Sequence, residues 1–372
     1  MRVAAIETFA VALPFREPYI AANGVLEARE MLVLRLRSDD GVCGHGDAVP
    51  LGLRGGPGLA AVGADLDQLC APVLAGSEIE LDLPAAEAGA AVRSLLAECA
   101  AAGAHGPALA AVDAALLDLV GRSLELPAWA LLGAESATAV ECNGTLGGGA
   151  VADVAAAAAE LAERGFATLK VKAGTGGDAE RLGAVREAAG AEVALRVDAN
   201  GAWNVEQAVA ALSALAAVGL ELAEQPCAEA PELAAVRARC AVPIVADESV
   251  ATRADADHCV ELGACDAATL KLAKVGGPHV ALALAADLPC YLSSALDSAL
   301  GIAAAVHTAQ ALPTTGFAAG RAHGLATAPL FADDIADTAA FAGPTIAPPD
   351  GPGLGVEVDD AALERLRIEV VG

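Results

Sequence analysis

The stretch FATLKVKAG, residues 166–174, places two lysines, Lys170 and Lys172, inside a run of apolar residues. The β-branched and apolar neighbours predict a β-strand, and side chains two residues apart on a strand point to the same face. Both ammonium groups would then be buried together, which costs free energy unless charged partners compensate. A lone Lys-x-Lys is usually a solvent-facing strand surface, so the meaning of this stretch depends on the segments around it.

Short apolar segments like this one recur along the middle of the chain, with Ala-rich amphipathic helices predicted between them. The segments are AVECNGT (139–145), ATLKVKA (167–173), VALRVDAN (193–200), LELAEQP (220–226), VPIVADES (242–249), AATLKLAK (267–274) and LPCYLSS (288–294). A weaker eighth candidate is TTGFAA (314–319). Strands that alternate with helices predict an α/β fold with a parallel sheet, here a modified (β/α)7β barrel of the TIM type.

The two ends of the chain differ from this pattern. Residues 1 to about 50 alternate as strands do, most clearly in MLVLRLRS (31–38), and residues 82–133 are typical of helices. We therefore expect an N-terminal α+β capping domain over 1–133 and a barrel domain over 134–320. The Gly- and Pro-rich segment 321–372 is expected to return and complete the capping domain.

Composition excludes some classes of function. The chain has 22 basic and 49 acidic residues, a formal charge of -27, which argues against binding to nucleic acids or to anionic membranes. Nine cysteines are dispersed without a CxxC pair, which is typical of reduced thiols in a cytoplasmic protein. An acidic small-molecule substrate would need local cations or a metal to overcome the negative field.

Charged side chains stand at the carboxyl ends of five consecutive predicted strands. They are Lys172, Asp198, Glu224, Asp247 and Lys271, and successive members are 26, 26, 23 and 24 residues apart. The carboxyl ends of barrel strands converge on one mouth, where active sites of this architecture are built. A lone Asp at a strand end is usually a turn former or a helix cap, but five charged residues in register indicate one shared site.

The chemistry of this site follows from its groups. Three carboxylates, on Asp198, Glu224 and Asp247, suit a hard divalent cation such as Mg2+, with Mn2+ as an alternative. A cation that chelates a substrate carboxylate stabilises the enediolate formed when the α-proton leaves. Lys172 is expected to be the base, because the adjacent charge of Lys170 favours its neutral form.

At this point the sequence resembles the enolase superfamily, muconate lactonizing enzyme subgroup. The resemblance extends over nearly the whole chain, including CGHGDAVPL (43–51). Its motifs are LKVKAG (169–174), RVDANGAW (196–203), LAEQP (222–226), PIVADES (243–249) and LKLAKVGG (270–277). It implies that the three carboxylates bind Mg2+, that Lys172 is one acid/base and that Lys271 is the lysine on the opposite face. Lys170 is implied as an auxiliary lysine and Asn200 as a polar neighbour of the metal.

Within the superfamily, the segment YLSSALDSALGIAAAVHTAQALP (291–313) resembles o-succinylbenzoate synthases, lyases that catalyse a syn dehydration in menaquinone synthesis. The resemblance implies that Lys172 removes the proton and, as the ammonium, assists departure of the hydroxyl group. Lys271 would stabilise the enediolate, and Ser293 and Ser294 would lie near the succinyl arm. Asp297 would either hydrogen-bond to Lys271 or cap the helix that follows.

Other reactions of the superfamily stay open. The full-length N-terminal domain, with the loop PYIAANGVLEARE (18–30), is more similar to cycloisomerases and epimerases, in which this loop closes over the substrate. Dipeptide epimerases have an Asp-x-Asp after the eighth strand, whereas no acidic residue occurs here between Asp297 and Asp333. A muconate-type cycloisomerase, an N-succinylamino acid racemase, a dipeptide epimerase and a non-catalytic ligand-binding relative are the alternatives, and a homo-oligomer is possible.

Overall fold

The computed structural model describes residues 1–21, 24–52 and 55–370. Three antiparallel strands form the N-terminal sheet in the order β1 (Val3–Ala21), β2 (Gly24–Ser38) and β3 (Cys43–Ala48). The predicted closing loop 18–30 is largely the end of the β1–β2 hairpin, because pairing resumes at Tyr19 with Leu26 after a register shift that begins at Pro14. Its residues 22–23 lie outside the described part of the chain.

Helices cover one side of this sheet and complete the α+β capping domain. They include α1 (Leu59–Ala64), a π-helical turn (Asp65–Cys70), α2 (Ala71–Leu74), α3 (Ala85–Ala101), α4 (Gly106–Leu124) and α5 (Ala128–Leu131). The central helix is α4, whose side chains are apolar on nearly every face and buried. It approaches β3 closely: a Cβ added at Gly44 would lie 2.4 Å from the carbonyl oxygen of Ala115. Glycine at this position therefore allows the helix to pack directly on the strand.

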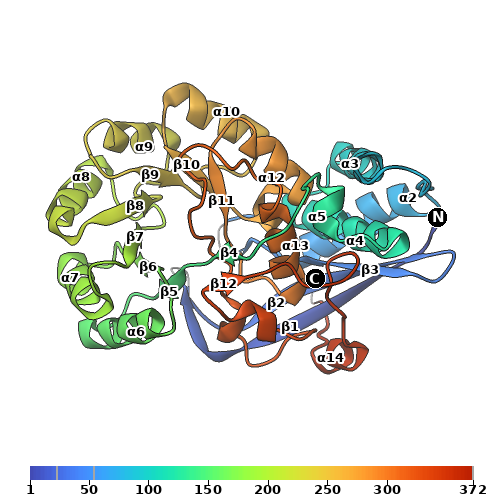
Figure 1. Ribbon diagram of the computed structural model, residues 1–372, viewed down its shortest axis with the longest axis horizontal. Coiled ribbons are helices and arrows are strands. Elements are labelled where there is room, and N and C mark those ends of the chain that lie inside the picture. The colour runs from blue at the N-terminus through green and yellow to red at the C-terminus, as the bar shows by residue number, and fades with distance from the viewer. Residues whose placement is uncertain (22–23, 53–54, 371–372) are drawn as a thin grey trace.

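A curled sheet of seven parallel strands forms the barrel (Figure 1). The strands, which neighbour one another in sequence order, are β5 (Gly144–Leu146), β6 (Thr168–Lys172), β7 (Ala194–Asp198), β8 (Leu220–Glu224), β9 (Ile244–Ala246), β10 (Ala267–Leu270) and β11 (Cys290–Leu292). Most of their residues are buried, as expected for parallel strands whose two faces are covered. The predicted α/β barrel is thus confirmed.

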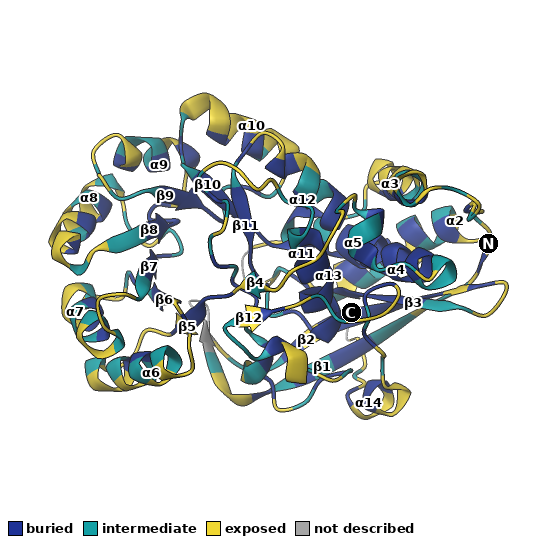
Figure 2. Ribbon diagram, viewed as in Figure 1, coloured by how far each residue is buried: buried dark blue, intermediate teal, exposed yellow. Residues whose placement is uncertain are grey.

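Helices alternate with these strands and form the outer layer of the barrel. They are α6 (Val151–Glu163), α7 (Asp178–Ala189), α8 (Val205–Ala214), α9 (Ala230–Arg237), α10 (Arg253–Leu262), α12 (Pro278–Ala285) and α13 (Ala299–Ala309), with the single turn α11 (Leu272–Val275) after β10. Figure 2 shows buried strands inside a ring of helices whose outer faces are exposed from α6 to α10. By contrast, α13 is buried along nearly its whole length, because it lies between the barrel and the capping domain.

The barrel closes at a different place from the one the sequence predicted. Residues 314–319 form turns rather than an eighth strand, consistent with Gly316 and Gly320 adopting positive φ. Closure instead uses two residues: His323 forms a parallel bridge with Cys142, and Gly324 forms one with Ser293. Two extended residues, His323 and Gly324, therefore join the first and last parts of the sheet in place of the predicted eighth strand.

The C-terminal segment contacts both parts of the molecule, as the predicted fold requires. Its strand β12 (Thr345–Ile346) pairs with β4 (Val140–Glu141), and its helix α14 (Asp360–Arg365) is followed by backbone hydrogen bonds to β1, including Ile368 N to Ala10 O at 2.9 Å. The domain limits at residues 133 and 320 stay predictions. Among the residues described, no helix combines the length and the apolar character that crossing a membrane requires.

Candidate active site

The sheet register brings the predicted site residues to one level at the barrel mouth. Lys172 at the end of β6 pairs with Asp198 on β7, which in turn pairs with Glu224 on β8. Asp247 and Lys271 each follow directly after their strands, β9 and β10. Asp198, Glu224 and Asp247 are at most 1% exposed, so the three carboxylates form a buried acidic cluster.

Lys170 and Lys172 form ion pairs with the carboxylates of β7 and β8. The Lys170 ammonium lies 3.1 Å from Asp198 Oδ2 and 3.1 Å from Glu224 Oε1, so it bridges the two strands. Lys172 donates to Asp198 Oδ2 at 2.7 Å and to Asn200 Oδ1 at 2.7 Å. The two lysines of FATLKVKAG are therefore partnered by carboxylates, which offsets the free energy that burial of their ammonium groups would otherwise cost.

A second pair of lysines holds the carboxylate of β9. Lys271 forms an ion pair with Asp247 Oδ2, and Lys274 lies 2.8 Å from Asp247 Oδ1. Lys274 also donates to the carbonyl oxygen of Thr269 at 3.4 Å. Lys274, which lies in the single turn α11, is thus a further cation at the site that the strand-end pattern did not predict.

The electrostatics of the cluster are set by burial and by these ammonium groups. Burial raises the pKa of Asp198, but the charges of Lys172 and Lys170 outweigh it and hold that pKa below its ordinary value. Burial raises the pKa of Glu224, and the charge of Lys170 only partly opposes this effect. Burial lowers the pKa of Lys170, yet the charges of Glu224 and Asp198 raise it well above the ordinary lysine value. These charges favour the ammonium form of Lys170, which suits an electrostatic role for this side chain.

The donor set fits a hard divalent cation. Within the described residues, no group of three or more His, Cys, Asp or Glu side chains is already arranged as a metal site, because the carboxylates point at lysine ammonium groups. The carboxylates are nevertheless close enough to interact: Asp198 and Asp247 both raise the pKa of Glu224. Three mutually repelling, buried oxygen ligands without histidine or cysteine suit Mg2+ or Mn2+.

The backbone just beyond β7 and β8 includes two non-glycine residues with positive φ. Asn200, two residues after Asp198, has φ 45°, and Gln225, directly after Glu224, has φ 38°. Positive φ in residues other than glycine is uncommon and clusters at functional sites. At Asn200 this conformation lets the side chain accept from Lys172 while donating to Glu248 Oε1 at 3.1 Å. Asn200 thus lies beside the carboxylate cluster, where the sequence predicted a polar neighbour.

The three residues predicted near the substrate lie at the turn between β11 and α13. Ser294 Oγ accepts from the backbone of Asp297 at 2.9 Å, and Asp297 Oδ2 accepts from the backbone of Ala295 at 2.9 Å. Ser293 Oγ donates to Gly324 O at 3.4 Å. The N-cap of α13 is Ser298, whose side chain accepts from Leu300 N, so the alternative assignment of Asp297 as the helix cap is wrong. Substrate contacts of these residues stay predictions.

Sequence reasoning missed two residues that contact the carboxylates. Lys274 lies three residues after Lys271 in a single turn, and Tyr291 OH donates to Glu224 Oε2 at 3.3 Å. The scarcity of lysine could have indicated Lys274, because the whole chain contains four lysines and all four contact these carboxylates. Strand alternation was a signal for the second, because Tyr291 precedes Ser293 by two residues and shares its face.

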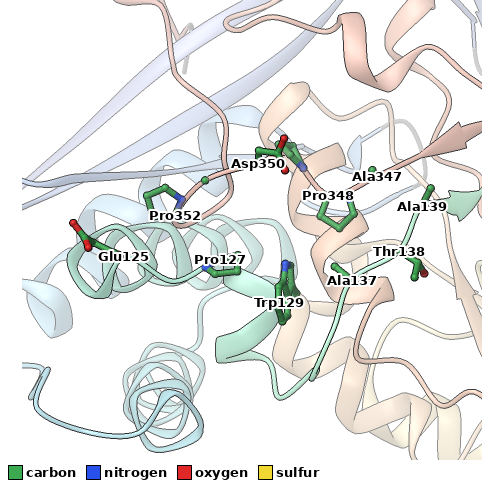
Figure 3. Close-up of a pocket in the computed structure, with 12 residues that line it drawn as sticks. Glu125, Pro127, Trp129, Ala137, Thr138, Ala139, Ala347, Pro348, Asp350 and Pro352 are labelled. Atoms are coloured by element: carbon green, nitrogen blue, oxygen red, sulfur yellow. The ribbon is translucent and has the colours of Figure 1, made fainter.

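A cavity of about 530 Å³ lies elsewhere, between the turn after α4 and the C-terminal segment (Figure 3). Its described lining includes Glu125, Trp129, Thr138 and Asp350 and none of the lysine–carboxylate cluster. Buried charges with perturbed pKa values are the better indicator of a reactive site, so we locate the candidate active site at the barrel mouth.

Two protein-family models together match most of the chain. Residues 4–133 match the N-terminal domain of mandelate racemase / muconate lactonizing enzyme, and residues 153–362 match the enolase C-terminal domain-like family. Curated relatives named o-succinylbenzoate synthase are 46% identical, over 183 residues in Mycobacterium ulcerans (47% of this chain, 54% of the relative) and 199 residues in Mycobacterium tuberculosis (50% and 59%). The chain thus spans somewhat more than half the length of the curated relatives it matches.

Solved structures match along almost the entire chain. The N-succinyl Arg/Lys racemase from Bacillus cereus has a TM-score of 0.90 at 25% identity, covering 99% of both chains. Muconate lactonizing enzyme from Pseudomonas fluorescens gives 0.88 at 26%, covering 98% of this chain and 99% of that one. A dipeptide epimerase from Cytophaga hutchinsonii, solved with Mg and a dipeptide, gives 0.87 at 28% over 99% of both. The chain belongs to the mandelate racemase / muconate lactonizing enzyme family of the enolase superfamily, a family of enzymes that generally use a divalent metal.

Proposed function

We propose that the protein is a metal-dependent enzyme that removes a proton α to a carboxylate, and that its reaction is the dehydration catalysed by o-succinylbenzoate synthases. The observation that carries this proposal is the position of Lys172 and Lys271 on either side of the buried carboxylates. Their strands, β6 and β10, are separated in the sheet by β7, β8 and β9. A substrate held over the carboxylates would then have one amine on each face, and the 46% identity to the synthases favours dehydration.

Mg2+ is the proposed cofactor, with Mn2+ as an alternative, held by Asp198, Glu224 and Asp247. The oxygen-only donor set supports this choice, as does the Mg-containing structure of the related dipeptide epimerase. A bound divalent cation would supply charge stabilisation for the substrate carboxylate as the α-proton leaves.

The lysines divide the remaining work. Lys172 takes the α-proton and returns it to the departing hydroxyl group, so the C–H and C–O bonds break, a C=C bond forms and water leaves. To do so it exchanges its present contacts with Asp198 and Asn200 for the substrate. Lys271 contributes positive charge on the opposite face, and Lys170 favours the ionised form of Asp198 and holds Asp198 and Glu224 in place. Such proton transfer contributes about 10²–10⁴ to a rate.

A second candidate is N-succinylamino acid racemisation. The racemase structure matches 99% of this chain, including the capping domain, whereas the synthase identity covers about half of it. A racemase needs a working base on each face, and Lys172 and Lys271 would supply the two bases. For either reaction we propose a small carboxylate substrate and a cytoplasmic location.

One experiment separates the two reactions. The purified protein is incubated with the cyclohexadiene precursor of o-succinylbenzoate, and separately in D2O with N-succinyl amino acids, with and without exhaustive chelation of metal. We expect dehydration that stops on chelation and returns with Mg2+. Deuterium incorporation without dehydration would favour the racemase, full activity after chelation would refute the metal assignment, and inactivity in every arm would favour a non-catalytic relative.

Lys271→Arg makes the comparison sharper. Arginine keeps the positive charge but does not release a proton at ordinary pH, so a residue that acts only by charge should tolerate the change better than a base does. We expect this variant to retain part of its dehydration rate and to lose racemisation. Equal loss of both would contradict the proposed electrostatic role of Lys271.

A further inference from the structure

The layer of the barrel interior directly beneath the lysine–carboxylate cluster is more polar than barrel interiors usually are. Side chains two residues before the cluster residues of β6 to β9, and two before Ser293 at the end of β11, point inward at this level, and barrels usually fill such layers with branched apolar residues. Leu222 and Val245 follow that rule. Lys170, Arg196 and Tyr291 do not, and each is at most 7% exposed.

Arg196 is the member of this layer whose burial is expected to cost the most free energy. It is 0% exposed, donates from Nε to Glu221 Oε2 at 2.6 Å and from Nη1 to Ala322 O at 2.7 Å. Within the described part of the chain its Nη2 is buried without a hydrogen-bond partner. Its remaining contact is the ring of Tyr291, whose centroid lies 4.8 Å from the guanidinium carbon. A buried guanidinium over an aromatic face is a favourable contact that fixes the plane of the ring.

Tyr291 connects this cation to the carboxylates above it. Its hydroxyl donates to Glu224 Oε2 at 3.3 Å, while Lys170 lies 3.1 Å from Oε1 and 3.3 Å from Oε2 of the same side chain. Glu224, on β8, is therefore held by side chains from β6 and β11, which lie two and three strands away from β8 in opposite directions along the sheet. Ligating carboxylates in metalloproteins are commonly oriented by such hydrogen bonds.

We propose that Tyr291, held by Arg196, is a positioning residue that fixes the orientation of Glu224 for binding of the divalent cation. This inference rests on the proposed role of Glu224 as a metal ligand. The alternative is a purely structural role, in which Arg196 and Tyr291 only fill the barrel and anchor the closing segment at Ala322. The two roles differ in what the Tyr291 hydroxyl does, because the ring alone would suffice for packing.

The test is Tyr291→Phe, which removes the hydroxyl and keeps the ring on Arg196. Its matched control is Cys290→Ala, which removes one sulfur atom from the neighbouring position on the opposite face of β11. Mn2+ binding is measured by electron paramagnetic resonance on the intact protein without substrate, alongside thermal unfolding. We expect the Mn2+ Kd of Tyr291→Phe to rise about ten-fold, the low end for a lost orienting contact, with the control unchanged and with activity recovering at saturating Mn2+.

The outcomes distinguish the two proposals. If the unmodified protein binds no Mn2+, the metal assignment fails and this inference fails with it. If the unmodified protein binds Mn2+ and Tyr291→Phe binds it equally well, only the positioning role is refuted. A higher Kd in both Tyr291→Phe and Cys290→Ala would also refute it, because a general disturbance of β11 would then explain the effect.

Discussion

At the scale of single residues, Lys172 differs from the other three lysines of the cluster in its exposure. Its side chain is 25% exposed, against 7–9% for Lys170, Lys271 and Lys274. It is therefore the lysine most accessible to a substrate that enters the barrel mouth. Its contacts with Asp198 and Asn200 set its direction, and a proton carrier must combine such orientation with access.

Lys172→Ala is expected to lower turnover by at least about 100-fold, because the base is lost, while the unfolding temperature stays close to that of the unmodified protein. Lys172→Arg is its matched control, since it keeps the charge but cannot act as a base. Both variants should fail to exchange the α-proton in D2O. Substantial activity in Lys172→Arg would show that Lys172 acts by charge alone.

At the scale of elements, the closure of the barrel depends on the close approach of two backbones. A Cβ added at Gly324 would lie 2.5 Å from Ser293 Oγ and 3.1 Å from Ser293 Cβ. Gly324 N also donates to Leu292 O at 2.8 Å, so the segment has little freedom to move away. Glycine is required here for space, and β11 could not otherwise be joined to the first part of the sheet.

Gly324→Ala is accordingly expected to lower the free energy of unfolding by about 1–3 kcal/mol through overpacking. Combining it with Ser293→Gly should recover much of the loss, because the clashing atoms are removed. Gly183→Ala in α7, where an added Cβ meets nothing within 4 Å, is the control and should be neutral or stabilising by up to about 1 kcal/mol. Denaturant unfolding measures all four proteins, and a harmless Gly324→Ala would contradict this account of closure.

The elements also show what sequence could and could not predict. Strands buried on both faces must be short apolar runs, so the segments ending at Lys172, Asp198 and Glu224 were recognisable from local pattern. Closure at His323 and Gly324 uses only two bridged residues and has no periodicity to detect. The contact of Tyr291 with Glu224 joins residues 67 positions apart, so strand alternation can place Tyr291 on the inward face, but the curl of the sheet decides which side chain it meets.

At the scale of the whole molecule, three acidic side chains meet at the amino end of α13. Asp47 from β3 accepts from Ser298 N at 2.9 Å, and Asp334 from the C-terminal segment accepts from Ala299 N at 3.2 Å. Asp297 directly precedes the N-cap residue Ser298, and its charge acts on Asp47. Capping domain, barrel and C-terminal segment are thus joined at one helix end, where the helix dipole favours negative charge.

Stability should depend on pH through this cluster. Burial raises the pKa of Asp47 to about 7, and the nearby Asp297 adds to that effect. The folded protein then holds a proton that the unfolded chain, with a pKa near 3.9, has lost. Between about pH 4 and pH 7 the unfolded state binds fewer protons than the folded state. The free energy of unfolding therefore falls as the pH rises, by at most about 1.4 kcal/mol per pH unit.

Asp47→Asn is expected to flatten this dependence, because the amide does not ionise but can still accept from Ser298. Urea unfolding of both proteins at several pH values across this range gives a difference that reports Asp47 together with its interaction with Asp297 and Asp334, whereas distant titrating groups cancel. The exposed Asp82→Asn serves as the control and should keep the original slope. Parallel pH profiles for Asp47→Asn and the unmodified protein would contradict the assigned pKa.

The concentration of all four lysines at the barrel mouth has a practical consequence for chemical labelling. The chain has no lysine outside the cluster, and its other strongly basic side chains are arginines. An amine-reactive reagent therefore finds only these four lysines and the terminal amine. Apart from the terminal amine, acylation or reductive methylation would therefore report on the mouth, with Lys172 reacting first because it is the most exposed of the four. A carboxylate that occupies the site should slow that reaction, which turns a nonspecific reagent into a probe for unknown substrates.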